Sequence, residues 1–127
     1  LILLCTKTYD LANSVERIRS NCSPKTLILP LQNGVNNTEQ VSALNPPGIC
    51  LEGLVYLIGY KTGPGEITQS GTYKQLMFGS QNQDIQEELK KVELLFLETG
   101  IEATFSTNIQ KQIWEKYFLI SSVGSRQ

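Results

Sequence analysis

A strand-helix-strand pattern at the N-terminal end constrains the fold more than any other feature of the chain. Residues 1–5 read Leu-Ile-Leu-Leu-Cys, a continuous apolar run typical of a strand buried on both faces of a parallel sheet. Residues 11–18 place their apolar side chains on one face of a short helix, with Asp10 in position to cap it. Residues 26–31 form a second apolar run. We therefore expect a βαβ unit with two parallel strands and a right-handed crossover.

The middle of the chain changes from helix-connected to turn-connected strands. We expect a short helix over residues 38–44, a strand interrupted by glycines over residues 49–60, and a turn at residues 63–65. Residues 66–73 alternate weakly between polar and apolar side chains, and residues 75–79 form a short apolar run. These two segments predict antiparallel strands or a hairpin. The pattern indicates a parallel sheet with an antiparallel extension.

The last part of the chain predicts two more helices around a short strand. Residues 85–96 carry apolar side chains on one helical face, and Gly100 follows in the position that ends a helix. Residues 101–106 indicate a short strand. Thr107 or Asn108 then caps a final helix.

Charge and residue composition argue against several classes of function. The 127 residues carry 11 basic and 12 acidic side chains, so the formal net charge of −1 favours neither nucleic acid nor an anionic membrane as a partner. With 0 histidines, the chain cannot form a Ser/His/Asp triad or a metal site with imidazole ligands. The 3 cysteines form no C-x-x-C pair, and no apolar run approaches the roughly 20 residues of a membrane span. We expect a cytoplasmic protein whose acid-base chemistry falls to Lys, Glu, Asp, Tyr or Cys.

Polar side chains follow both predicted parallel strands at the point where each strand ends. Lys7 comes after the first apolar run, and Asn33 and Gly34 come directly after the second. Ligands of open α/β sheets bind beyond the carboxyl ends of the strands, so Lys7 and Asn33 would share one rim of a site if the strands are neighbours. Gly34 permits a positive φ and close approach of a ligand to the backbone. From the spacing alone, an exposed lysine and an ordinary Asn-Gly turn are the commoner explanation.

Lys116 is a third candidate because large apolar side chains flank it in the final helix, from Trp114 to Ile120. A partly desolvated ammonium has a lowered pKa and can act as a general acid. A lysine that extends from an amphipathic helix into water is the commoner arrangement, and Trp114 is most simply a core residue. No G-x-G-x-x-G motif occurs, so the chain has no glycine-rich cradle for a pyrophosphate.

Several short segments follow one another along the chain in a characteristic order: Leu-Leu-Cys-Thr-Lys7, Gln32-Asn33-Gly34, Glu52-Gly53, Gly63-Pro64-Gly65, Phe78-Gly79, Thr99-Gly100 and Trp114-Glu115-Lys116. Together they resemble the ketopantoate reductase (2-dehydropantoate 2-reductase) family over essentially all 127 residues. The resemblance implies an oxidoreductase that uses NADPH to reduce the 2-oxo acid ketopantoate to pantoate, a step toward pantothenate and coenzyme A.

The resemblance also implies a domain organisation. Residues 1–106 would form the C-terminal part of a Rossmann-type dinucleotide-binding domain, and residues 107–127 the first helix of an all-helical substrate domain. The active site would lie in the cleft between the two domains. The phosphate-binding loop would precede Leu1 and further helices would follow Gln127, so we expect the chain alone to be inactive.

Four residues match positions to which the family assigns a role. Lys7 matches a lysine that contacts the nicotinamide cofactor, and Asn33 an asparagine that touches cofactor and substrate. Lys116 matches the lysine that binds the substrate and donates a proton to its carbonyl oxygen. Gly59 falls near a position where the backbone meets the cofactor.

Two residues depart from the family pattern. The family often carries asparagines one and two turns after the catalytic lysine, where they hold the substrate, whereas this chain has Ile120 and Gly124. A related 2-oxo acid or hydroxyacid dehydrogenase of different specificity therefore stays open as an alternative. A further alternative is a non-catalytic fragment that forms a homo-oligomer through Leu1 to Cys5, an apolar strand left without a neighbour on one side.

Overall fold

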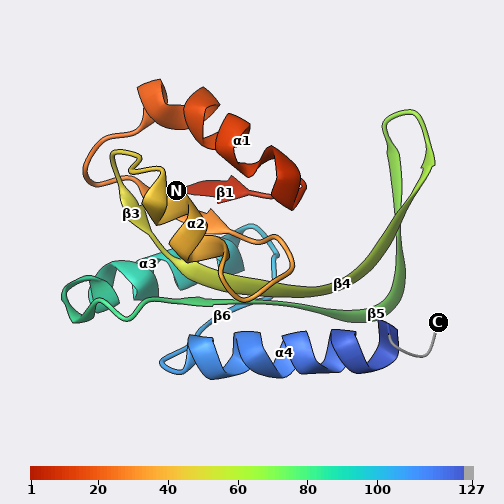
Figure 1. Ribbon diagram of the computed structural model, residues 1–127. Coiled ribbons are helices and arrows are strands. Elements are labelled where there is room, and N and C mark those ends of the chain that lie inside the picture. The colour runs from red at the N-terminus through yellow and green to blue at the C-terminus, as the bar shows by residue number, and fades with distance from the viewer. Residues whose placement is uncertain (125–127) are drawn as a thin grey trace.

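The structure of the protein, a computed structural model, describes residues 1–124 and has a mixed α/β fold (Figure 1). The strands are β1 (Ile2–Leu4), β2 (Leu27–Pro30), β3 (Ile49–Cys50), β4 (Glu52–Gly63), β5 (Glu66–Gly79) and β6 (Ala103–Phe105). The α-helices are α1 (Leu11–Ile18), α2 (Asn37–Ala43), α3 (Gln86–Glu98) and α4 (Ile109–Gly124), and short 3-10 helices cover Thr8–Asp10, Arg19–Asn21 and Gln83–Ile85. The expected α/β class, with parallel strands and an antiparallel extension, is confirmed.

The first three strands form a parallel sheet in the order β1-β2-β3. Ile2 lies opposite Ile28, and Leu27 lies opposite Ile49. Because α1 connects β1 to β2, the predicted βαβ unit is confirmed. Successive side chains of β2 point to opposite faces, and both faces are covered. Ile28 packs with α1 and α2, whereas Leu29 belongs to the cluster built around α3.

The strand β1 is less buried than its apolar sequence predicts. Within the described residues it is hydrogen-bonded only to β2, and Leu1 and Leu3 are 45% and 40% exposed. Leu4 is buried against α1. The expectation that residues 1–5 form a strand buried on both faces is therefore wrong in this structure, whereas β2 is the strand with both faces covered.

A long antiparallel hairpin of β4 and β5 forms most of the second sheet, in which β6 pairs in parallel with β5. The apolar run that predicts one strand over residues 49–60 divides at Leu51, whose N–H donates to the Ile28 carbonyl at 2.7 Å. Its first part stays in the parallel sheet as β3, and the rest leaves that sheet as β4. Residues 66–79 form one continuous strand, so the hairpin is confirmed although a single strand replaces the two expected segments.

The hairpin is irregular near its middle. The register shifts between Tyr56, which pairs with Gln75, and Ile58, which pairs with Ser70. Residues 71–74 of β5 therefore stand opposite Leu57 alone. Gly71 has a φ of 77°, a conformation that favours glycine. Bulges of this kind bend a strand. Figure 1 shows the distal half of the hairpin curving away from α4.

The helix boundaries largely follow the sequence pattern. α1 begins directly after Asp10, but the Asp10 side chain does not cap it, and the Ser14 hydroxyl donates to the Asp10 carbonyl at 2.9 Å. α4 begins directly after Asn108, whose carbonyl accepts from the N–H of Gln112. Gly100, with a φ of 80°, ends α3 as predicted. The apolar positions expected to face the core from the α3 region are all buried: Ile85, Leu89, Val92 and Phe96.

Helix α4 lies along the sheet of β4 and β5 (Figure 1). Ile109 and Ile113 occupy its face toward the sheet, where they form a small buried cluster with Leu54. Trp114, expected in the core, is therefore turned outward and is 43% exposed. Neither α4 nor any other helix among residues 1–124 has the length and apolar character needed to cross a membrane.

Candidate active site

Two of the residues singled out by sequence, Lys116 and Asn33, meet in the folded chain. The Lys116 Nζ atom donates to the Asn33 Oδ1 atom at 2.9 Å, across a separation of 83 residues. The same ammonium donates to the Val55 carbonyl and lies 5.5 Å from the centre of the Tyr56 ring. Lys116 comes from α4, Asn33 from the loop after β2, and the other two residues from β4. Packing of α4 against β4 therefore assembles the site.

The surroundings of Lys116 make its ammonium more acidic than that of an ordinary lysine. Its partners are an amide oxygen, a backbone carbonyl and an aromatic face, and none of them carries a negative charge. Among the described residues, Lys116 forms no salt bridge. Burial therefore disfavours the charged form without compensation, and the pKa of Lys116 is lowered. A lysine in this state is suited to give a proton to a ligand oxygen.

The loop that carries Asn33 is held in place from within. Gly34 adopts a φ of 126°, and the buried Asn37 side chain donates to the Gln32 carbonyl at 2.6 Å and more weakly to the Asn33 carbonyl at 3.4 Å. Sequence reasoning missed the part played by Asn37. Its signal is an Asn just after an Asn-Gly turn, because such side chains commonly bond to nearby backbone.

An open groove of about 1090 Å³ runs beside the Lys116 and Asn33 pair. Its walls come from β4, from the bulge of β5 and from α4. A second cavity of about 220 Å³ reaches the same pair from the side of Gln32 and Gly53. Asn33, Lys116 and Ile120 line both spaces. A small ligand in either space therefore has access to the Lys116 ammonium.

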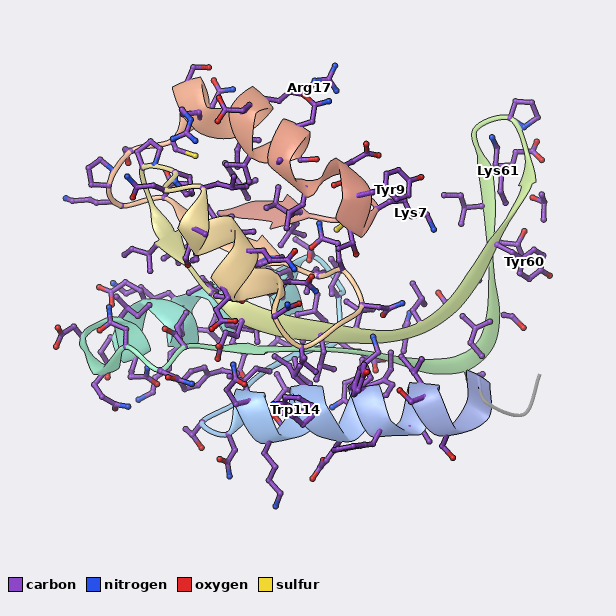
Figure 2. All side chains as sticks on the ribbon, in the orientation of Figure 1. Lys7, Tyr9, Arg17, Tyr60, Lys61 and Trp114 are labelled. Atoms are coloured by element: carbon purple, nitrogen blue, oxygen red, sulfur yellow. The ribbon has the colours of Figure 1, made fainter. Side chains whose placement is uncertain are left out.

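Lys7 lies at the same edge of the parallel sheet but away from this pair. The Leu31 N–H donates to the Leu4 carbonyl at 2.9 Å, so Lys7 and Asn33 follow the ends of two neighbouring strands, as predicted. The Lys7 side chain lines neither cavity and makes no hydrogen bond or salt bridge with the described part of the chain, while the Lys7 carbonyl accepts from the Asp10 N–H at 2.9 Å. Figure 2 shows its side chain extending outward beside Tyr9.

Gly59 lies in the distal half of the hairpin, opposite Gln69, and lines neither of the two spaces at Lys116. A Cβ atom at this position would lie 3.6 Å from the Thr68 carbonyl oxygen, an ordinary contact. The fold alone therefore does not require a glycine here.

A second titratable group fixes the start of α4 to the sheet. The Gln110 side chain on α4 donates to Glu52 Oε1 at the start of β4. The other Glu52 oxygen is buried without a hydrogen-bond partner among the described residues. Burial raises the pKa of the Glu52 carboxyl, partly offset by this hydrogen bond. No group of three or more Cys, Asp or Glu side chains within residues 1–124 is placed to hold a metal ion.

Comparison with known proteins identifies the family. Residues 1–83 match the sequence model of the family described as "Ketopantoate reductase PanE/ApbA". The chain belongs to the ketopantoate reductase family. The family resemblance drawn from the sequence is thus confirmed.

Individual relatives agree with this assignment. The 2-dehydropantoate 2-reductase of Halobacterium salinarum is 26% identical over 116 residues, which are 91% of this chain and 38% of the relative. An uncharacterised oxidoreductase of Bacillus subtilis, YkpB, is 26% identical over 96% of this chain and 40% of its own length. The chain thus spans about 40% of the length of these two relatives.

Solved structures of oxidoreductases share the fold. The crystal structure of 2-dehydropantoate 2-reductase from Porphyromonas gingivalis W83 matches with a TM-score of 0.81 and 32% identity, over 94% of this chain and 42% of that one. A ternary structure of D-mandelate dehydrogenase with NADH and anilino(oxo)acetate matches with a TM-score of 0.80 and 25% identity, over 91% of this chain and 37% of that one. The chain therefore has the fold of a segment of these oxidoreductases.

Proposed function

We propose that the chain is a segment of an NADPH-dependent enzyme that reduces ketopantoate, a 2-oxo acid, to pantoate. The observation that carries this proposal is the half-buried Lys116 ammonium, hydrogen-bonded to Asn33 beside an open groove. Relatives from Halobacterium salinarum and Aquifex aeolicus are named 2-dehydropantoate 2-reductase. Residues 1–106 would then belong to a dinucleotide-binding domain and residues 107–127 would begin a helical substrate domain. In this proposal the isolated chain is inactive and the whole enzyme is cytoplasmic.

The geometry suits reduction of a ketone. Negative charge builds on the ketone oxygen as the new C–H bond forms, and the Lys116 ammonium neutralises that charge and then transfers its proton to the oxygen. A nicotinamide cofactor, when bound, supplies the hydride. Asn33 Oδ1 orients the ammonium, while its Nδ2 group makes no hydrogen bond within the described residues and can donate to a substrate oxygen. The products would be a secondary alcohol, the oxidised nicotinamide and a neutral Lys116, which regains its proton from solvent.

The residues present fit the nicotinamide end of such a cofactor. A Cβ at Gly34 would meet nothing closer than 3.7 Å, so there is space for a ligand against this backbone. Lys7 offers an amine at the carboxyl edge of the parallel sheet, where dinucleotides bind in related folds. We propose Lys7, Asn33 and Gly59 as the cofactor contacts of this chain. The 127 residues contain no G-x-G-x-x-G motif, so the pyrophosphate cradle is not part of them.

The pH dependence of reduction tests the role of Lys116. The full-length gene product is expected to oxidise NADPH when given ketopantoate, at a rate that needs the ammonium form. Because burial lowers the pKa of Lys116, the rate should be constant at low pH and fall as pH rises through a value below the usual lysine pKa of about 10.4. Steady-state kcat measured across this range gives the profile.

The matched variant for this profile is Lys116→Arg, which keeps the positive charge and does not lose its proton in this range. Its lower residual activity should show no decline at high pH. If the decline persists unchanged in Lys116→Arg, another group is the proton donor.

The exposed edge of β1 supports a second proposal, that the isolated 127-residue chain self-associates. Leu3 is exposed on a strand that, within the described residues, is paired on one side only. We expect sedimentation to show dimers or larger species, and Leu3→Lys to shift the chain toward monomer because a charged edge resists strand pairing. Leu94→Lys, at an exposed site on α3, is the control. A monomer at high concentration without substitution would contradict the proposal.

A further inference from the structure

We propose that the groove beside Lys116 recognises an apolar group next to the ketone of its 2-oxo acid and provides no hydrogen bond to a hydroxyl on that group. Ile120 sets this preference. The substrates would be 2-oxo acids that carry a bulky alkyl or aryl group next to the ketone. The inference rests on the proposed reduction of a 2-oxo acid and specifies the substrate class of the same site.

Ile120 is placed on α4 where its side chain can contact a substrate held by Lys116. It lies four residues after Lys116, which is one helical turn, so the two side chains share a face of α4. Ile120 also lines both spaces that Lys116 and Asn33 line, and it is 44% exposed. A ketone held at the Lys116 ammonium therefore meets a hydrocarbon side chain one turn further along the helix, with no hydrogen-bonding group.

The neighbouring walls extend this apolar surface. Leu119 also lines the groove from α4, and Val55, Leu57 and Met77 line it from the sheet. Two polar groups of the lining are already engaged: the Val55 carbonyl accepts from Lys116, and the Gln112 side chain accepts from the Ser106 hydroxyl. Asn33 and Glu115 also line the groove, beside Lys116 and not at Ile120. The side-chain hydroxyls of the lining belong to Tyr56 on β4 and to Ser70 and Thr72 on β5, and none comes from α4.

Such a site discriminates only weakly between a substrate with a hydroxyl and the analogue that lacks it. A pocket built to hydrogen-bond a substrate hydroxyl rejects the analogue without it by about 10⁴-fold to 10⁵-fold, whereas an apolar pocket tolerates both within about 10²-fold. Trimethylpyruvate is the matched probe, because a methyl group replaces the hydroxymethyl group of ketopantoate on the same carbon skeleton. The unsubstituted enzyme should use trimethylpyruvate at least as well as ketopantoate.

The experiment compares the two ketones on the full-length protein and on Ile120→Asn, which adds a donor and an acceptor at this position. We expect Ile120→Asn to shift the ratio of kcat/KM toward ketopantoate by about tenfold or more, the size of one new hydrogen bond. Phe118→Asn is the control, since Phe118 is exposed on the same helix and lines neither space. It should leave the ratio unchanged.

Calorimetric binding of both ketones in the presence of the coenzyme separates this inference from the proposed reaction. Binding with the expected ratio, but without oxidation of NADPH or NADH, would refute the reductase proposal and support the apolar groove. A preference of the unsubstituted protein for ketopantoate above about 1,000-fold would overturn the inference. An unchanged ratio in Ile120→Asn, or binding of neither ketone, would overturn it as well.

Discussion

Replacing Lys116 by Met is expected to lower kcat for 2-oxo acid reduction by about 10²-fold to 10⁴-fold in the full-length protein, the usual contribution of a positioned general acid. The thioether fills the space of the lysine stem but carries neither charge nor proton. The ketone oxygen then gains its charge without a partner in the groove. The value of KM should change less than kcat, because the ammonium acts most strongly where charge develops.

Lys111→Met is the control for this result, because Lys111 is an exposed lysine on the same helix and lines neither cavity. Its kcat should match that of the unsubstituted enzyme. Circular dichroism and the Tm of both variants show whether the fold is retained. A folded Lys116→Met enzyme with full activity would contradict the mechanism.

Phe78→Ala is expected to reduce the free energy of unfolding by about 3 to 5 kcal/mol, the usual cost of deleting a buried phenylalanine side chain. Phe78 of β5 is fully buried, and its ring centre lies 5.8 Å from that of Phe96 on α3 and 6.2 Å from that of Phe105 on β6. The substitution therefore opens a cavity where three elements meet. Such a loss is a large fraction of the free energy of unfolding of a typical folded protein, which is about 5 to 15 kcal/mol.

Urea-induced unfolding of the full-length protein measures this loss, with Phe118→Ala as the matched control. Phe118 is 64% exposed, and its ring lies tilted against Trp114 and edge-on to Tyr117. Its removal should therefore cost no more than about 1.5 kcal/mol. Equal losses for the two variants would mean that the Phe78 cluster is not the core of this domain.

Features determined by local spacing could be predicted from the sequence. The α3 helix has its apolar residues at helical intervals and Gly100 just after its end, and both signals act within a few turns. The division at Leu51 could not be predicted in this way. Every residue around it suits a strand, and the change of partner depends on pairing with β2 on one side and β5 on the other. Such long-range pairing leaves little trace in local composition.

The candidate site shows the same limit. Spacing placed Asn33 at a strand end and Lys116 among apolar neighbours, but only the fold brings their side chains to 2.9 Å. The expectation that Trp114 lies in the core is wrong. Apolar residues of α4 after this position occur on several sides of the helix, so the sequence does not show which face is buried. The choice of Ile109 and Ile113 as the buried face follows from contact with the hairpin. The placement of Lys7 and Gly59 away from this pair was not foreseeable from their order in the chain.

The way α4 is attached has a consequence for how the candidate site is lost. Among the described residues, α4 is held by the smallest of the apolar clusters, with Leu54, Ile109 and Ile113 as its buried members, while larger clusters hold the two sheets. Local opening of one helix needs less free energy than unfolding of the whole chain. Detachment of α4 would separate Lys116, the proposed proton donor, from Asn33 while the strands stay paired. If the proposed function holds, loss of enzymatic activity is an earlier indicator of damage to this molecule than any spectroscopic measure of its sheets.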